Sequence, residues 1–248
     1  YAQSVEKSTC GNADGGADIF IDTFGDVPTF YEWSNGSTDE DLVDVPSGSY
    51  TLTFTDQGGC TNYLTVKIVD EKPYQPQICL LTVDTSYTYN QVVWEKVPGE
   101  NIDGFNVYRE TSVFGTFERV ADRPVAFESF LIDNSASPAD RSWRYAVTTY
   151  DACGNESYKS FIHKTIHTVA STANGTDYII SWDDYEGISY SSVDLYRKDA
   201  TNDWQNIGNF PVGTNNFPDT PPNVNGLDYI VSFNLTDPCT STKATDYN

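Results

Sequence analysis

Apolar and polar residues alternate along most of the chain in short segments of about five to seven positions. This period of two places one face of a strand on a core and the other in water. Residues that favour turns separate the segments. These turn signals lie at Asn35-Gly36, Pro46-Ser47-Gly48, Gly58-Gly59, Pro98-Gly99, 134–138, Gly154-Asn155, Asn174-Gly175, 213–216 and Pro221-Pro222. The pattern predicts an all-β protein.

One ordered set of residues occurs twice, which indicates two homologous units in series. Each unit has a Trp, a Tyr-Arg pair, an Asp, a Tyr and a Cys in the same order, and the distance from the Trp to the Tyr-Arg pair is the same in both. The two sets are Trp94, Tyr108-Arg109, Asp133, Tyr145, Cys153 and Trp182, Tyr196-Arg197, Asp219, Tyr229, Cys239. Each unit is predicted to form a seven-stranded sandwich.

The first seventy residues lack this repeat but have the same strand-and-turn style, with strands predicted over 17–21, 29–33, 49–55 and 62–69. A short linker stiffened by Pro73 and Pro76 follows. We therefore expect three tandem immunoglobulin-like β-sandwiches. Their predicted boundaries are 1–72, 73–167 and 168–248, and the tail from Thr240 is barely long enough to give the third sandwich its last strand.

Length and charge limit the possible partners. The chain has 248 residues, which suits two or three sandwiches of roughly 100 residues or fewer. Its net charge of −22 repels phosphate backbones and anionic headgroups, so nucleic acid and membrane surfaces are poor partners. No apolar run approaches the roughly 20 residues that span a bilayer, and we expect no direct membrane insertion. The chain reads as a mature or excised piece.

The two repeat units resemble fibronectin type III domains. The resemblance rests on the Trp of the second strand, the third strand 105–109, and the sixth strand, Tyr145-Ala146-Val147, which leads into 151–157. That last run is similar to a version found in large surface proteins of gliding and biofilm-forming Bacteroidetes. The usual tyrosine-corner position holds Trp143 in one unit and Leu227 in the other, so that hydrogen bond is not carried over.

The first domain resembles the repeat of flavobacterial gliding-motility adhesins. The motifs are Cys10-Gly11, Asp14-Gly15, 31–36, 48–52, Thr55-Asp56 and Gly59-Cys60. This resemblance implies export through the type IX secretion system and display at the cell surface, so the chain is expected to be extracellular. It also implies, as partners, proteins of the secretion or cell-surface machinery, or surface glycans.

The five cysteines form no CxxC pair, which argues against zinc and thioredoxin-type sites. Cys10 and Cys60 occupy the first-strand and final-loop positions of the first domain, and Cys79 and Cys153 occupy the same places in the second. In a sandwich these places lie at one pole, so we predict the disulfides Cys10–Cys60 and Cys79–Cys153, with buried free thiols as the alternative. Cys239 is left unpaired; a neighbouring chain, an absent segment or the reduced state would each account for it.

Candidate metal ligands are sparse. His163 and His167 are four residues apart, a spacing compatible with a metal, but 161–166 alternates as an ordinary last strand. The acidic clusters Asp39-Glu40-Asp41 and Asp183-Asp184 could hold Ca²⁺, although neither has the spacing of a dedicated calcium loop. We expect solvated acids and no cofactor.

No catalytic motif is recognisable. The chain has no Gly-x-Ser-x-Gly elbow, HExxH pair or glycine-rich phosphate loop, so we predict that it is not an enzyme. The favoured function is a non-catalytic stalk or adhesin segment involved in adhesion or gliding. Two alternatives stay open: an accessory, glycan-binding region of a secreted enzyme, which a coplanar row of exposed aromatic side chains would favour, and a decoration or tail domain of a phage particle.

Overall fold

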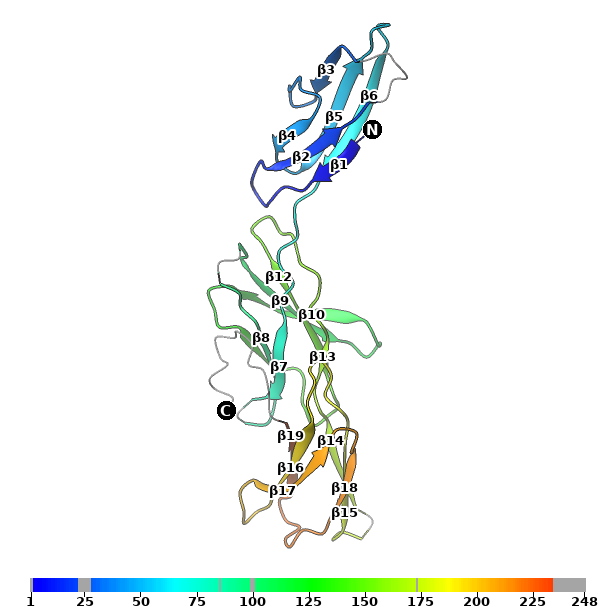
Figure 1. Ribbon diagram of the computed structural model, residues 1–248. Coiled ribbons are helices and arrows are strands. Elements are labelled where there is room, and N and C mark those ends of the chain that lie inside the picture. Colours follow the sequence, from blue (N-terminus) through cyan, green and yellow to red (C-terminus); the bar gives the residue numbers. More distant parts are fainter. Residues whose placement is uncertain (1, 22–27, 85, 99–100, 173, 234–248) are drawn as a thin grey trace. The chain divides into compact units, whose positions relative to one another are not determined.

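The computed structural model describes residues 2–21, 28–84, 86–98, 101–172 and 174–233, which fold into antiparallel β-sheets (Figure 1). The chain divides into two compact units. Unit 1 comprises Tyr1–Pro73 and Tyr150–Ser157, and unit 2 comprises Tyr74–Thr149 and Tyr158–Asn248. None of the described residues belongs to a helix that is long and apolar enough to cross a bilayer.

Unit 1 contains one sandwich of two three-stranded sheets, with the orders β1-β2-β4 and β3-β5-β6. The strands are β1 (Ala2–Glu6), β2 (Gly15–Ile19), β3 (Phe30–Trp33), β4 (Leu42–Val45), β5 (Gly48–Thr55) and β6 (Thr61–Ile68). Alternate residues of both sheets, including Trp33, Leu42, Leu52 and Ile68, form the buried core. Strands β1 and β4 were not predicted from the sequence pattern.

The first sandwich of unit 2 has seven strands in two sheets, β11-β8-β7 and β10-β9-β12-β13. The strands are β7 (Ile78–Val83), β8 (Asn90–Trp94), β9 (Gly104–Glu110), β10 (Phe117–Pro124), β11 (Phe130–Asp133), β12 (Arg144–Tyr150) and β13 (His163–Lys164). This is the strand order of a fibronectin type III domain. Strand β13 is shorter than the predicted 161–166, and its Lys164 pairs with Arg144 of β12 on one side and with Glu186 on the other.

The second sandwich of unit 2 repeats this order in β14-β15-β18 and β17-β16-β19. Its strands are β14 (Thr168–Thr172), β15 (Tyr178–Trp182), β16 (Ser192–Lys198), β17 (Gln205–Pro211), β18 (Asn216–Asp219) and β19 (Asp228–Ser232). The tail that would supply its last strand lies outside the described residues, as does Cys239. The prediction of an all-β chain of tandem immunoglobulin-like, fibronectin type III-like sandwiches is confirmed.

A buried polar triad explains the repeated residues. In the first sandwich of unit 2, Arg109 on β9 donates to Asp133 on β11 at 2.9 Å, and the Tyr145 hydroxyl on β12 donates to the same carboxylate oxygen at 2.9 Å. Burial alone would raise the pKa of Asp133, but hydrogen bonds from Ser135 and Tyr145 and the charge of Arg109 outweigh it and lower the pKa. The triad therefore ties the two sheets together with a paired charge.

The second repeat builds the same triad at the corresponding positions. Arg197 on β16 donates to both oxygens of Asp219 on β18, at 2.8 and 2.9 Å, and the Tyr229 hydroxyl on β19 donates to Asp219 at 2.8 Å. Each carboxylate is thus shared between a guanidinium and a phenol, so its negative charge is paired where an unpaired charge would be costly. The polar residues of the repeat are retained because they act together.

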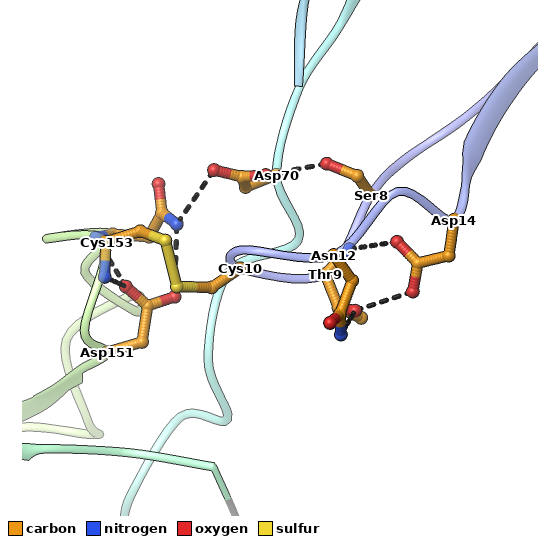
Figure 2. Close-up of a disulfide and its surroundings, with 9 residues drawn as sticks. Ser8, Thr9, Cys10, Asn12, Asp14, Asp70, Asp151 and Cys153 are labelled. Atoms are coloured by element: carbon orange, nitrogen blue, oxygen red, sulfur yellow. Dashed lines mark hydrogen bonds between the residues drawn. A yellow bond between two sulfur atoms is a disulfide. The ribbon is translucent and has the colours of Figure 1, made fainter. Parts of the chain in front are cut away.

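The predicted disulfide pairs are wrong. Cys10 is bonded to Cys153, with a Cα–Cα distance of 5.7 Å (Figure 2). Cys60 is an exposed free thiol, and Cys79 is disulfide-bonded but not to Cys153. The error came from the unpredicted strand β1, which places Cys10 in the loop between β1 and β2.

The pairing of β6 explains why Cys10 is not bonded to Cys60. Ser8 pairs with Asp70, just beyond the C-terminal end of β6, whereas Cys60 precedes the N-terminal end of β6 at Thr61. An eight-residue strand is about 25 Å long, so Cys10 and Cys60 lie at opposite poles of the sandwich.

Local hydrogen bonds hold both bonded cysteines in place. Thr9 donates its N–H and its hydroxyl to Asp14, at 2.7 and 2.6 Å, which shapes the loop that carries Cys10. The Asp151 carboxylate accepts the N–H groups of Cys153 and Asn155, at 3.0 and 2.8 Å, which closes the turn around Cys153. Acidic residues of this chain therefore serve as caps of tight turns.

Candidate functional site

The candidate site is the joint between the two sandwiches of unit 2. The loop after β15, residues 183–190, inserts Tyr185 into the core of the preceding sandwich, where it packs with Ile78, Leu81 and other buried residues. The Tyr185 oxygen accepts the backbone N–H of Leu81 at 2.7 Å. One sandwich therefore completes the core of the other.

Tyr185 also contacts His163 on β13, which is 3% exposed. Nδ1 of His163 and the Tyr185 hydroxyl are hydrogen-bonded at 2.9 Å, and the two rings meet edge to face. Burial lowers the pKa of His163 to about 4 and raises the pKa of Tyr185. The joint is therefore built around a neutral imidazole.

Gly187 brings the loop close to the His163 ring. Its φ of +119° lies in a region that favours glycine, and a Cβ at this position would lie 2.3 Å from ring carbons of His163. Both the backbone conformation and the close approach exclude a side chain. A glycine is required here for the loop to reach Leu81.

Backbone pairing continues the sheet of the first sandwich across the joint. Lys164 and Glu186 exchange two backbone hydrogen bonds, at 3.0 and 3.3 Å, next to β13. The N–H of His167 donates to the Asp183 carboxylate at 2.7 Å. The connection from β13 to β14 is thus fixed by hydrogen bonds along its length, unlike a flexible tether.

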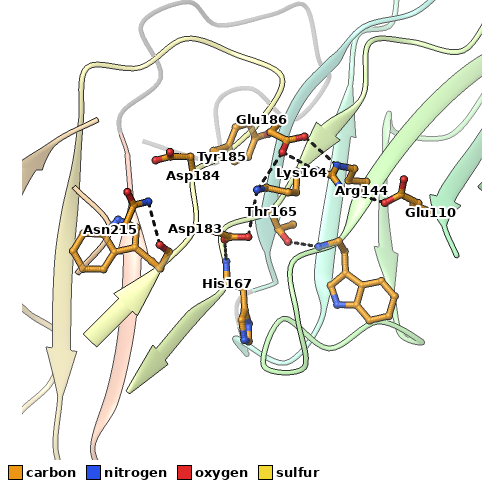
Figure 3. A network of polar contacts seen from close by, with 12 residues as sticks. Glu110, Arg144, Lys164, Thr165, His167, Asp183, Asp184, Tyr185, Glu186 and Asn215 are labelled. Carbon is orange, nitrogen blue, oxygen red and sulfur yellow. Dashed lines mark hydrogen bonds and ion pairs between the residues drawn. The ribbon is translucent and has the colours of Figure 1, made fainter. Parts of the chain in front are cut away.

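An ion-pair network covers this pairing (Figure 3). Arg144 donates twice to Glu186, at 3.0 and 2.8 Å, and also pairs with Glu110 at 3.3 Å. Lys164 pairs with Asp183 at 3.3 Å and with Glu186 at 3.2 Å. The hydrogen bonds from Arg144, opposed by burial and supported by Lys164, lower the pKa of Glu186. The network holds the two sandwiches through side chains that are partly open to solvent.

The candidate metal ligands do not converge. His163 faces Tyr185, whereas Nδ1 of His167 contacts the carbonyl of Pro138 at 3.0 Å. Over the described ranges, Cys10, Asp151 and Cys153 are the one group of three potential metal ligands, and the two sulfurs are bonded to each other, so they are not available to a metal.

Asp39, Glu40 and Asp41 are exposed to solvent, and residues of both acidic clusters also take part in hydrogen bonds or ion pairs. Asp41 accepts the backbone N–H of Ile19 at 2.9 Å, and the carbonyl of Asp39 accepts the indole N–H of Trp33 at 3.1 Å. Asp183 belongs to the joint. The signal that would have pointed to the joint is the run 183–187, in which a Tyr and a Gly interrupt an otherwise acidic loop.

Comparisons with known proteins gave structural likeness only. No protein-family model matches the chain, and no curated protein matches it in sequence. The FN1–FN3 domains of chicken CNTN1 are 10% identical, with 93% of this chain and 92% of that one covered and a TM-score of 0.28. A tetra-tandem repeat in the extending region of a large adhesion protein is 13% identical, with 94% and 72% covered and a TM-score of 0.27.

Salmonella alpha-2-macroglobulin reacted with methylamine is 9% identical, and the match covers 85% of this chain but 20% of that one, with a TM-score of 0.23. Because all three TM-scores are low, we base the proposals below on the residues of this chain alone.

Proposed function

We propose that this chain is a non-catalytic spacer segment of an extracellular, adhesin-type protein. The observation that carries the proposal is the joint of unit 2, where Tyr185 of one sandwich is buried in the core of its neighbour. A spacer transmits force and sets reach only if successive domains resist bending and separation. A shared core, paired backbone and an ion network supply that resistance.

The disulfide supports the same role in unit 1. The segment Tyr150–Ser157 belongs to unit 1, where Cys153 is bonded to Cys10. Closing a loop with a sequence separation of 143 residues stabilises the native state by about 5 kcal/mol in the chain-entropy model. Disulfides persist in oxidising compartments, which supports an extracellular location.

The finer identity rests on the motifs of residues 1–72 and 151–157. Their resemblance to gliding-motility adhesins and to Bacteroidetes surface proteins supports export as type IX secretion cargo and a role in adhesion or gliding. The partners proposed on this basis are components of the secretion or cell-surface machinery and surface glycans. A glycan-binding accessory region of a secreted enzyme is the second candidate function, favoured by the exposed Phe30 and Tyr63 on one sheet of unit 1.

Single-molecule force spectroscopy on the full chain, with its disulfides intact, tests the spacer role. We expect the two sandwiches of unit 2 to yield in one force peak in the wild type. In the Gly187→Ala variant, where a methyl group meets the His163 ring, that peak should split into two weaker ones. Two independent peaks already present in the wild type would overturn the proposal, as would reproducible enzymatic turnover that a single Asp or Glu substitution abolishes.

A further inference from the structure

The outer face of the sheet β3-β5-β6 in unit 1 presents a regular array of threonines. Leu52 on β5 is buried in the core, so its neighbours in the strand point away from the core. Cross-strand pairing aligns Thr51 with Thr65 and Thr55 with Thr61 on this outer face. We call the surface formed by these residues and Thr53 the threonine face.

Hydroxyl groups across the threonine face are held at fixed spacing. The Oγ1 atoms of Thr51 and Thr65 are 3.1 Å apart, and those of Thr55 and Thr61 are 3.3 Å apart, so each pair forms a hydrogen bond. Successive threonines of β5 repeat every two residues, about 7 Å, and the strands are about 4.8 Å apart. A hydroxyl both donates and accepts, so the face offers both kinds of polar partner in rows.

Two exposed aromatic side chains flank the array. Phe30 on β3 pairs with Thr55 and is 48% exposed, and Tyr63 on β6 pairs with Thr53 and is 72% exposed. They lie on opposite outer strands of the same face, with β5 between them. Strand propensity favours both threonine and aromatic residues, and the feature of this face is that it combines the two on neighbouring strands.

Charge is nearly absent from this face although the domain is strongly acidic. Residues 1–73 contain thirteen Asp or Glu and three Lys or Arg. On the strands of the threonine face the outward charged residues are Glu32 and Lys67, one of each sign. The acids gather instead around a cleft on the other sheet, which is lined by Glu6, Asp18 and further acidic residues. The face therefore suits an uncharged partner.

We propose that the threonine face binds a neutral polysaccharide. Sugar rings present apolar C–H faces that stack on aromatic rings and hydroxyls that need donors and acceptors at regular intervals, and this face supplies both. An anionic polysaccharide would be repelled by the acidic remainder of the domain. This inference rests on the extracellular role proposed above and names the partner.

Retention on insoluble neutral polysaccharides, crystalline cellulose and chitin, tests the proposal with the full chain. We expect Tyr63→Ala and Thr53→Glu each to weaken binding at least about tenfold, the first by removing a stacking ring and the second by placing a charge in the array. Phe161→Ala is the matched control, because Phe161 is an equally exposed aromatic residue (75%) of unit 2. It should bind as the wild type does, and near-ultraviolet circular dichroism should show all three variants folded.

Several results would overturn the proposal. These are no retention on either neutral polysaccharide, retention only on polygalacturonate, retention unchanged by both substitutions in the threonine face, and self-association or protein binding that needs the same face. Because the force measurement probes unit 2 and this one probes unit 1, failure of the glycan proposal is distinguishable from failure of the spacer role.

Discussion

The two sandwiches of unit 2 share a sequence repeat and an Arg–Asp–Tyr triad but differ in how their cores are completed. Strand β8 of the first is buried along its whole length, whereas the corresponding strand β15 of the second alternates between buried and open positions. Within the described residues, the second sandwich also has the smaller buried core and gives its Tyr185 to the first. The repeat thus preserves the triad, while the loop 183–190 adds Tyr185 to the core of the first sandwich.

The largest expected effect is at the shared tyrosine. Tyr185→Ala removes a buried ring and leaves the Leu81 N–H without its acceptor, which we expect to lower the free energy of unfolding of unit 2 by about 3–5 kcal/mol. Tyr185→Phe keeps the ring and should cost about 1–3 kcal/mol. Denaturant unfolding measures both, with the exposed Tyr63→Ala as control. Equal stability of Tyr185→Ala and Tyr63→Ala would show that the joint is a surface contact.

Substitutions in the two triads should lower the free energy of unfolding by different amounts. Asp133→Asn removes the buried carboxylate that pairs with Arg109 and leaves the more exposed Glu118 as its charged partner, so we expect a loss of about 2–3 kcal/mol in the free energy of unfolding. The equivalent Asp219→Asn should cost less, because Tyr229 is only partly buried while Tyr145 is fully buried. Thermal unfolding of the two variants side by side makes the comparison. A larger loss for Asp219→Asn would show that the second sandwich depends more on its triad than the first does.

Acid should weaken the joint through His163. The folded-state pKa of about 4 lies below the ordinary 6.5, so protonation favours unfolding. The contribution, at most about 3 kcal/mol, is fully present above pH 6.5 and is lost as the pH falls to 4. His163→Gln should flatten the stability profile of unit 2 in this window. Parallel profiles for wild type and His163→Gln would contradict the buried neutral imidazole.

The sequence predicted the all-β class and the repeat because both follow from local patterns. Alternation of apolar residues marks a strand wherever it lies, and the paired Trp, Tyr-Arg, Asp and Tyr positions mark the two related sandwiches. The triad itself was not predicted, because its three members come from separate strands. The hydrogen bond of Trp143 was not predicted either. Its indole N–H donates to the Ser137 carbonyl at 2.7 Å, although the hydrogen bond of the tyrosine corner was not carried over to this tryptophan.

The disulfides and the joint depend on contacts that local patterns do not contain. Because strand β1 was not predicted, Cys10 was expected at the same pole of the first sandwich as Cys60, whereas it is bonded to Cys153. Tyr185 looks like an ordinary loop residue until it is placed beside Leu81, which is 104 residues away in the chain. Loop burial of this kind is set by the partner surface and not by the loop's own sequence.

Hydrogen exchange of the full chain, wild type against Tyr185→Ala, tests most directly the claim that one sandwich completes the core of the other. Exchange in β5 and β6 of unit 1 serves as the internal reference. We expect Tyr185→Ala to accelerate exchange in β7 and β8 as well as in residues 183–190. Acceleration confined to residues 183–190, with β7 and β8 as protected as in the wild type, would contradict the shared core.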